Sequence, residues 1–361
     1  MVNHLYVHIP FCPKVCPYCS FYKEASDRNK TKDFLEALLR EAEEGAEGVN
    51  PRTVFFGGGT PTALSTPQLQ FLIRGLRERI SFPAQCEFTL EMNPATVSLE
   101  KAVALLELGV NRVSMGVQSW DDRLLETLGR VHSAALARRS FQILREAGVP
   151  SVNLDLIFGI PGQTEGQWRD TLMRTIDLGP DHISAYCLTY EEDTEFFLRF
   201  QGGEFAPLEQ RDADFFEIAM DALEAAGFLQ YEISNYAKPG HECLHNLAYW
   251  QGEDYFGLGP SAFSTRNGLR WRNIPDTTEY TRRVLSGRDA RDFQEEVGPG
   301  IRRTERLAFL LRTSGGVPLS EIPGFRFSPL VSSGLALIGE GRLVLTRKGR
   351  MVADQIASEL I

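Results

Sequence analysis

Three cysteines near the N-terminus constrain this chain more than any other feature. Cys12, Cys16 and Cys19 stand at C-x3-C-x2-C spacing, directly after the apolar run Leu5–Ile9, which is typical of a strand. Three thiols so close together can converge on one metal site, and thiolate is a ligand suited to zinc or to iron–sulfur clusters. Three protein ligands are one fewer than a closed tetrahedral site needs. The open position can therefore take a substrate or a cofactor.

The same cysteines are also compatible with a structural zinc site, which would need His8 or a distant cysteine as its fourth ligand. A disulfide framework is disfavoured, because a chain of 361 residues with 43% hydrophobic and 24% charged residues is typical of a soluble globular protein. The first residues show no signal-peptide pattern, so we expect a cytoplasmic protein with reduced cysteines. Cys86 and Cys187 fall in predicted strands and are expected to be plain buried residues.

Short apolar runs alternate with longer amphipathic ones along the first half of the chain. The predicted strands are Leu5–Ile9, Thr53–Phe56, Phe88–Leu90, Arg112–Val117, Ser151–Phe158 and His182–Leu188. The predicted helices between them are Thr31–Glu44, Pro67–Ile80, Leu99–Leu108, Ser133–Ala147 and Gln167–Leu178. This alternation predicts an α/β fold whose parallel sheet curves into a partial (β/α)6 TIM-like barrel.

Polar and glycine-rich residues follow the predicted strands, at the rim where the carboxyl ends of barrel strands carry function. They include the cysteine loop, the run from Gly57 to Pro61, Glu91, Gln118 and Asp155. Taken singly, each is accounted for by local structure, because glycines make tight turns and carboxylates cap strands in solvent. Together on one rim they favour a small-molecule site, in which glycines let the backbone approach a ligand and offer it N–H groups.

The remainder of the chain is expected to form a bridging segment and a small C-terminal domain. We place the barrel at residues 1–226, the bridging segment at 227–290 and the C-terminal domain at 291–361. Tyr255–Ser264 is expected to be a glycine-bearing loop that could return to the rim. Predicted helices at Arg302–Leu311, Ser328–Ile338 and Arg347–Leu360, with a strand at Leu343–Leu345, indicate a winged-helix-like unit. The net charge of −10 argues against nucleic-acid binding, and no apolar stretch is long enough to cross a membrane.

These motifs resemble those of the radical S-adenosylmethionine (radical SAM) superfamily, whose three cysteines hold three irons of a [4Fe-4S] cluster. In that superfamily the fourth iron is left for S-adenosyl-L-methionine (AdoMet). Four stretches, residues 6–12, 56–61, 114–118 and 155–161, are similar to the oxygen-independent coproporphyrinogen III oxidase family, which includes the HemW-type heme chaperones. The resemblance implies AdoMet contacts from Tyr6, Tyr18, Gly58, Gly59, Thr60, Glu91, Gln118, Arg130, Asp155 and Ala185.

Two positions bear on which member of that family the chain resembles. The oxidase has a further cysteine two residues after the third, where this chain has Phe21. HemW-type proteins have phenylalanine there and an H-N-x-x-Y-W motif, which matches His245, Asn246, Tyr249 and Trp250. The resemblance therefore implies that the chain binds heme and hands it to acceptor proteins, with any membrane contact made through a partner. We expect no coproporphyrinogen dehydrogenase activity.

Two questions stay open at this point. His245 could ligate heme iron, or it could be a buried histidine in an aromatic cluster, in which case His241 and Cys243 are the next candidate ligands. The alternative function is that of the oxidase, which removes propionate carboxyl groups from the porphyrinogen as CO2. The intact set of rim residues keeps that alternative under consideration.

Overall fold

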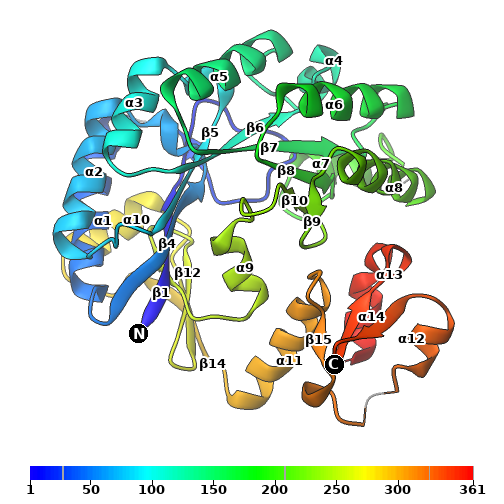
Figure 1. Cartoon of the computed structure of the whole chain (residues 1–361). Coiled ribbons are helices and arrows are strands. Elements are labelled where there is room, and N and C mark those ends of the chain that lie inside the picture. The colour runs from blue at the N-terminus through cyan, green and yellow to red at the C-terminus, as the bar shows by residue number, and fades with distance from the viewer. Residues whose placement is uncertain (27, 207–208, 325, 361) are drawn as a thin grey trace.

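The computed structural model describes residues 1–26, 28–206, 209–324 and 326–360 of the chain. A nine-stranded sheet with the order β11-β1-β4-β5-β6-β7-β8-β10-β9 curves around a central space, and its helices lie on the outside (Figure 1). The predicted strands correspond to β1 (Val2–Ile9), β4 (Val49–Gly58), β5 (Glu87–Met92), β6 (Arg112–Gln118), β7 (Ser151–Phe158) and β8 (His182–Cys187). They pair in parallel in chain order, which confirms the partial barrel.

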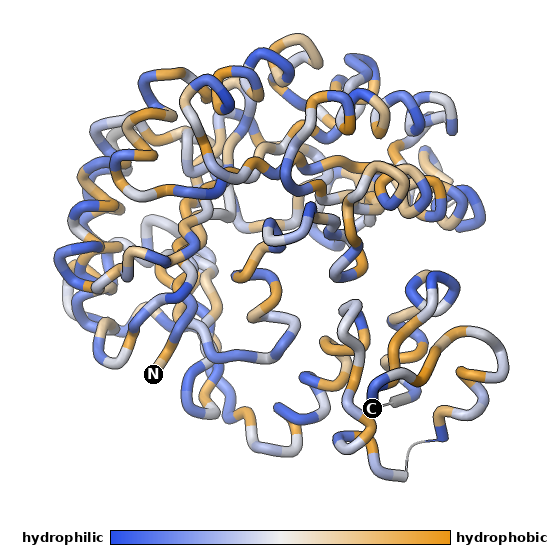
Figure 2. The backbone as a smooth tube through the Cα atoms, in the orientation of Figure 1, coloured by the Kyte–Doolittle hydropathy of each residue, from blue (hydrophilic) through white to orange (hydrophobic). Residues whose placement is uncertain are grey.

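The outer helices form where capping residues and apolar faces coincide, and apolar and polar residues alternate along them (Figure 2). In α6, Thr164 and Gln167 form a capping box, and Gly179 ends the helix with φ 69°. The helices around the barrel are α1 (Arg28–Gly45), α2 (Thr66–Arg79), α3 (Leu99–Glu107), α4 (Asp122–Thr127), α5 (Ala134–Ala147), α6 (Glu165–Leu178), α7 (Glu195–Gln201) and α8 (Glu209–Ala225). The sequence pattern did not predict α4 and α7, because six and seven residues are too few to show a helical period.

One strand of the barrel lies in a segment that was expected to be a loop. Within Tyr255–Ser264, β11 (Phe256–Leu258) pairs in parallel with β1, so the chain returns to the sheet edge beside the first strand. Three residues with Gly257 at the centre give no readable strand pattern. At the opposite edge, β9 (Leu229–Gln230) and β10 (Asn235–Ala237) add two short antiparallel strands.

A buried carboxylate holds α1 against the returning segment. Glu41 accepts hydrogen bonds from the Gly259 amide at 2.8 Å, from the Tyr280 hydroxyl at 2.5 Å and from Asn273 Nδ2 at 2.6 Å. Burial raises the pKa of Glu41 to about 7, although the three donors act in the opposite direction. This cluster fixes the position of β11 and of helix α10 (Thr277–Leu285) beside the first strand.

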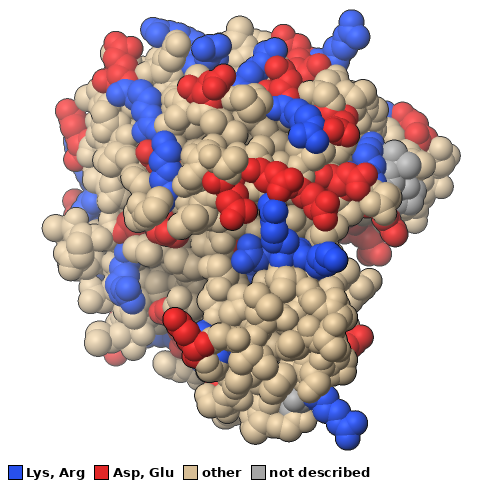
Figure 3. All heavy atoms as spheres, turned by 45° about the vertical axis from the view of Figure 1, so that its right-hand side comes forward, with Lys and Arg blue, Asp and Glu red and all other residues tan. Residues whose placement is uncertain are grey.

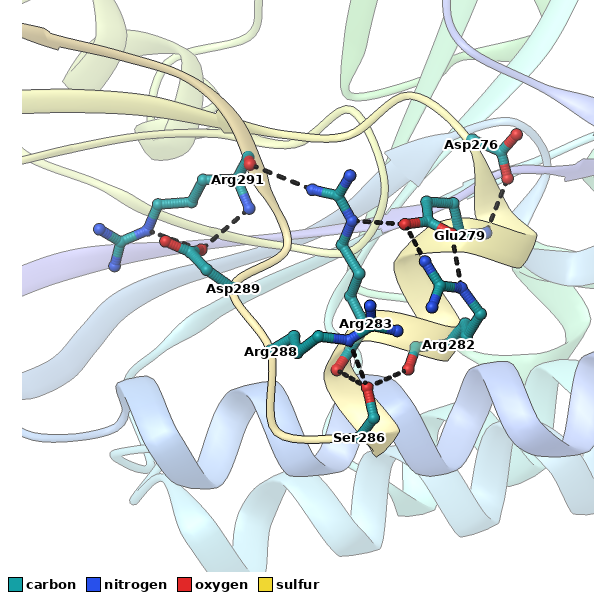
Figure 4. A network of polar contacts seen from close by, with 8 residues as sticks. All are labelled: Asp276, Glu279, Arg282, Arg283, Ser286, Arg288, Asp289 and Arg291. Carbon is teal, nitrogen blue, oxygen red and sulfur yellow. Dashed lines mark hydrogen bonds and ion pairs between the residues drawn. The ribbon is translucent and has the colours of Figure 1, made fainter.

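Helix α10 and the strand after it are also joined at the surface (Figure 4). The Asp276 carboxylate caps α10 by accepting from the Glu279 amide at 2.8 Å, and Glu279 in turn accepts from Arg282 and Arg283. Arg283 also donates to the Arg291 carbonyl at the start of β14 (Arg291–Glu296). These ion pairs lie near the surface and are weakened by solvent, so their main effect is to orient the turn. Strand β14 completes a small antiparallel sheet with β12 (Phe263–Arg266) and β13 (Leu269–Asn273).

The C-terminal part has its own apolar core, which includes Leu311, Val317 and Leu343. Its elements are α11 (Pro299–Leu311), β15 (Val317–Pro318), α12 (Ser328–Ser332), β16 (Ala336–Gly339), β17 (Arg342–Leu345), α13 (Arg347–Met351) and α14 (Ala353–Leu360). The strands form an antiparallel sheet of order β15-β17-β16, in keeping with a winged-helix-like unit. The exact domain boundaries stay a prediction.

The helix predicted over Ser328–Ile338 is wrong in its second half. Gly334 has φ 75° and turns the chain out of α12, and the following residues form β16. Glu340 and Gly341 both have positive φ and join β16 to β17 in a tight hairpin. The predicted strand at Leu343–Leu345 is confirmed as part of β17.

The C-terminal part meets the barrel along a charged boundary, where acidic and basic side chains face each other (Figure 3). Arg347 lies 2.7 Å from an Asp221 carboxylate oxygen and 3.6 Å from one of Glu224, both on α8. None of the helices in the described part of the chain is long and apolar enough to cross a membrane.

Candidate functional site

The three cysteines of the motif lie in one loop at the rim of the barrel. Cys12 ends β2 (Phe11–Cys12), and all three thiols are free and partly exposed. Cys12 Sγ lies 3.6 Å from Thr60 Oγ1, and Cys16 Sγ lies 3.6 Å from a guanidinium nitrogen of Arg130. Burial raises the pKa of the Cys12 and Cys19 thiols, and Arg130 acts in the opposite direction on Cys12. The loop thus combines three soft ligands with a cation that favours the anionic form of Cys12 and lies beside Cys16.

The arrangement of these thiols is not that of a site for a single metal ion. Within the described residues, no three cysteine, histidine or carboxylate side chains converge as one ion would require. A zinc ion holds its sulfur ligands at about 2.3 Å, whereas a cluster distributes its cysteines over separate irons. His8, the nearby candidate for a fourth zinc ligand, uses both ring nitrogens, one with the Tyr22 carbonyl at 2.8 Å and the other with the Tyr6 hydroxyl at 3.1 Å.

The glycine run at the end of β4 brings its backbone close to the cysteine loop. The amides of Gly59 and Thr60 donate to the carbonyls of Ile9 and Phe11, both at 2.8 Å. A Cβ atom on Gly59 would lie only 2.7 Å from the Pro10 carbonyl, so glycine is required there. We expected these amides to be free for a ligand. They are instead used to fasten the cysteine loop to the rim.

A cavity of about 520 Å³ lies inside the barrel, beneath the cysteine loop. Of the residues expected to bind AdoMet, those that line it are Tyr18, Gly58, Gly59, Thr60, Glu91, Gln118, Arg130 and Asp155. Tyr6 and Ala185 do not line it. Tyr6 is hydrogen bonded to His8, and Ala185 is 1% exposed within β8. The structure therefore brings most of the predicted set to one place.

Further polar residues line the same cavity and were not predicted from the sequence. They are Thr89, Arg112, Ser114, Asn153, His182, Ser184 and Tyr186. Most of them alternate with apolar residues along β6, β7 and β8, as in Asn153-x-Asp155 and His182-x-Ser184. Side chains at every second position of a strand point to one face. Polar residues at every second position of a strand were therefore the sequence signal from which they could have been predicted.

Two half-buried carboxyl groups and a half-buried guanidinium line the cavity, those of Glu91, Asp155 and Arg130. Burial, and then the neighbouring Asp155, raises the pKa of Glu91 to about 8. Burial also raises the pKa of Asp155, which accepts from Ser114 Oγ at 2.9 Å and Asn153 Nδ2 at 2.7 Å. Arg130 donates to the Gly116 carbonyl at 2.9 Å, but its buried Nε has no hydrogen-bond partner among the described residues. An unpaired donor beside acceptors fits a ligand that carries both a carboxylate and hydroxyl groups.

Backbone strain is also found at this site. Gln118 has φ 68°, a conformation unusual for a residue other than glycine, at a register irregularity between β6 and β7. The irregularity lies at the cavity, where Gln118 is one of the lining residues.

Phe21 and Cys187 also line the cavity, and both side chains are exposed. Phe21 is 67% exposed. Cys187 was expected to be buried, and that is wrong. It is exposed and lines the cavity, because β8 ends there. Cys86 is buried as expected.

The H-N-x-x-Y-W motif forms most of α9 (Leu244–Trp250), which lies between the barrel and α11 (Figure 1). His245 is 1% exposed, and burial lowers its pKa to about 3. Asn246 lines the barrel cavity, whereas Tyr249 and Trp250 line a second cavity of about 420 Å³ on the side of α11. The motif therefore touches two cavities, and the structure does not bring its four residues into one.

The first backbone amides of α9 are hydrogen bonded to the carboxylate of Glu87 on β5. The Glu87 carboxylate accepts from the Leu244 amide at 2.9 Å and the His245 amide at 3.0 Å. No local pattern indicates this contact, because the partners are more than 150 residues apart. It anchors the motif to the base of the barrel.

Comparison with known proteins separates the members of the family. Residues 6–174 match the radical SAM superfamily. The chain is 36% identical to the heme chaperone HemW of Bacillus subtilis, and the match covers 97% of each chain. The chain belongs to the HemW family. It is also 41% identical to HemW of Escherichia coli, over 79% of this chain and 76% of that one.

A solved structure shows how closely the HemW fold follows that of the oxidase. Coproporphyrinogen III oxidase (HemN) from Escherichia coli superposes with a TM-score of 0.86 at 26% identity, covering 99% of this chain and 90% of its own. Membership of the radical SAM superfamily implies a [4Fe-4S] cluster and AdoMet. The shared fold extends over the C-terminal part as well as the barrel.

Proposed function

We propose that this HemW-family protein binds heme and delivers it to acceptor proteins, while it carries a [4Fe-4S] cluster and AdoMet in its barrel. The observation that carries the proposal is the H-N-x-x-Y-W helix, which is seated beside an aromatic cavity outside the barrel. The heme cargo and AdoMet then occupy separate spaces. We also propose that the chain acts in the cytoplasm and that any contact with a membrane is made through a partner protein.

The barrel cavity supplies groups of the right chemistry for both resident cofactors. Cys12, Cys16 and Cys19 would hold the cluster, which supplies one-electron chemistry when bound. Arg130 would pair with the carboxylate of AdoMet through its free Nε. Glu91 and Asp155 would accept hydrogen bonds from hydroxyl or ammonium groups. The protein's own contribution is to position these groups and to limit access of water.

The second cavity has the character of a porphyrin site. The rings of Trp250 and Phe309 lie 6.1 Å apart, nearly perpendicular, and form an apolar wall. Arg302 and Arg306 stand at its edge, where they could pair with propionate groups in exchange for their present partners Asp254 and Glu321. Trp250 Nε1 is buried without a hydrogen-bond partner among the described residues. His245 would be the iron ligand from within the helix.

Asp155→Ala is expected to weaken AdoMet binding by about tenfold or more, because a buried charged hydrogen bond is lost. Cluster content should be unchanged, since Asp155 accepts hydrogen bonds from Ser114 on β6 and Asn153 on β7 rather than from the cysteine loop. Calorimetry and iron analysis on the anaerobically reconstituted protein measure the two properties. Asp170→Ala, on the exposed face of α6, is the matched control. An unaltered affinity in Asp155→Ala would remove this residue from the AdoMet site.

Transfer of heme tests the function directly. Reconstituted protein loaded with one equivalent of ferric heme is expected to pass it to an apo heme protein faster than the same heme dissociates into buffer. Absorbance of the acceptor's Soret band follows the transfer. Heme that is not bound, or that leaves at the same rate with and without an acceptor, would contradict the proposal.

A further inference from the structure

A continuous chain of buried hydrogen bonds lies behind His245 and ends at the surface. Thr53 Oγ1 on β4 lies 2.7 Å from His245 Nδ1 and 2.9 Å from His4 Nδ1 on β1. His4 Nε2 lies 2.9 Å from a Glu253 carboxylate oxygen. Thr53, His4 and His245 are each at most 3% exposed, whereas the side chain of Glu253 is 33% exposed.

The chemistry of these groups gives each bond a direction. A carboxylate only accepts, so His4 Nε2 donates to Glu253, and in the neutral ring His4 Nδ1 is left as an acceptor. The Thr53 hydroxyl then donates its one hydrogen to His4 and accepts from His245 Nδ1. His245 Nε2 is therefore the nitrogen with the free lone pair.

In the structure, the hydroxyl of Tyr249 donates a hydrogen bond to that lone pair. Its hydroxyl lies 3.1 Å from His245 Nε2, and the ring centroids are 4.8 Å apart at nearly a right angle. Tyr249 lines the second cavity and His245 does not, so the phenol ring separates the imidazole from that space. A ligand that approaches His245 from the cavity has to displace this one side chain.

We propose that Glu253, His4 and Thr53 are positioning residues that fix His245 as the iron ligand of heme, with Nε2 presented to the second cavity, and that Tyr249 is a displaceable cap over it. The inference rests on the proposed function and adds to it residues outside the H-N-x-x-Y-W motif. Histidines that bind metals commonly donate their other N–H to a fixed acceptor, which sets the tautomer and the ring orientation. Here Thr53 is that acceptor, and its own hydrogen is committed to His4.

Ferric heme titration of the full-length, cluster-loaded protein tests the chain of bonds. Thr53→Val keeps the shape of the side chain but removes the hydroxyl, and it is expected to weaken heme binding by about 10- to 100-fold. It should also change the electron paramagnetic resonance signal of the ferric iron, which reports the strength of the axial imidazole. Thr53→Ser retains the hydroxyl and should restore both. Glu253→Ala removes the acceptor for His4 Nε2, whereas Glu253→Gln keeps an acceptor oxygen, so the first should weaken heme binding and the second should not. Glu253 is partly exposed, so these substitutions should not disturb folding.

The Tyr249→Phe variant shows whether Tyr249 covers His245 Nε2 or is itself the ligand of the heme iron. Without the hydroxyl, the hydrogen bond that holds the ring over Nε2 is lost, so the ring is displaced more easily and heme should bind faster and at least as tightly, with the imidazole signal retained. Tyr190→Phe is the control, because Tyr190 stacks on Phe200 at 4.9 Å between ring centroids and lines neither cavity. Loss of the iron signal in Tyr249→Phe, with the signal kept in His245→Ala, would overturn the inference and make Tyr249 the ligand.

The two proposals fail in distinguishable ways. If the wild-type protein binds no heme, the proposed function itself is wrong. If it binds heme, and Thr53→Val and Glu253→Ala leave both affinity and spectrum unchanged, only the positioning role is overturned. Circular dichroism of each variant shows whether the helix and barrel are intact.

Discussion

Replacing Cys16 with alanine is expected to abolish the broad visible absorbance of the reconstituted protein. The wild-type chain should hold about four irons and four sulfides when reconstituted anaerobically. Cys16 is the thiol beside the half-buried Arg130 guanidinium, at 3.6 Å, so its loss removes a ligand from the electropositive side of the loop. Two cysteines and a solvent-exposed loop cannot retain the cluster. Iron and sulfide analysis, together with the visible spectrum, measures the effect.

Two cysteines outside the motif are matched controls for that substitution. Cys86→Ala removes a buried thiol far from the loop, and Cys187→Ala removes one that lines the same cavity. Both variants should keep full iron content. Protein that carried stoichiometric zinc and no iron after anaerobic reconstitution would contradict the cluster and support a structural metal site.

The barrel could be predicted from sequence because its strands are long and apolar and the helices between them carry clear capping signals. Ser151–Phe158, for example, was placed with its observed bounds. Elements whose stability comes from tertiary contacts were missed. The strand β11 has three residues and depends on Glu41, far away in the chain, to hold Gly259 in place. No local pattern reports such a contact.

The rim of the barrel was predictable for a different reason. Residues at strand ends converge whenever the strands are parallel, so Thr60, Glu91 and Asp155 could be brought together before the structure was known. The heme motif could not be treated in this way. Its spacing on a helix places Tyr249 one turn after His245, but which cavity each residue faces depends on how α9 packs between β4 and α11. That packing is set by Glu87, Thr53 and Phe309, none of which is close in sequence.

We expect no decarboxylation of coproporphyrinogen III by this protein, even with AdoMet and a strong reductant present. HemN shares the fold, so the same assay on that enzyme is the positive control. The difference lies in the lining of the barrel cavity, where Phe21 follows Cys19 by two residues and is 67% exposed. A phenyl ring can pack over the cluster loop, but it can neither ligate a metal nor transfer a proton.

The same cluster-loaded sample should bind ferric heme, and His245→Ala should lower the affinity or shift the heme spectrum, because an axial nitrogen is lost. Measuring both properties on one preparation matters, because an inactive cluster would also give no decarboxylation. AdoMet binding by calorimetry shows that the barrel is competent in that sample. AdoMet-dependent formation of protoporphyrinogen IX would overturn the chaperone function in favour of the oxidase. Heme binding that does not change in His245→Ala would leave the chaperone function in place and move the ligand, with His241 and Cys243 next to be tested.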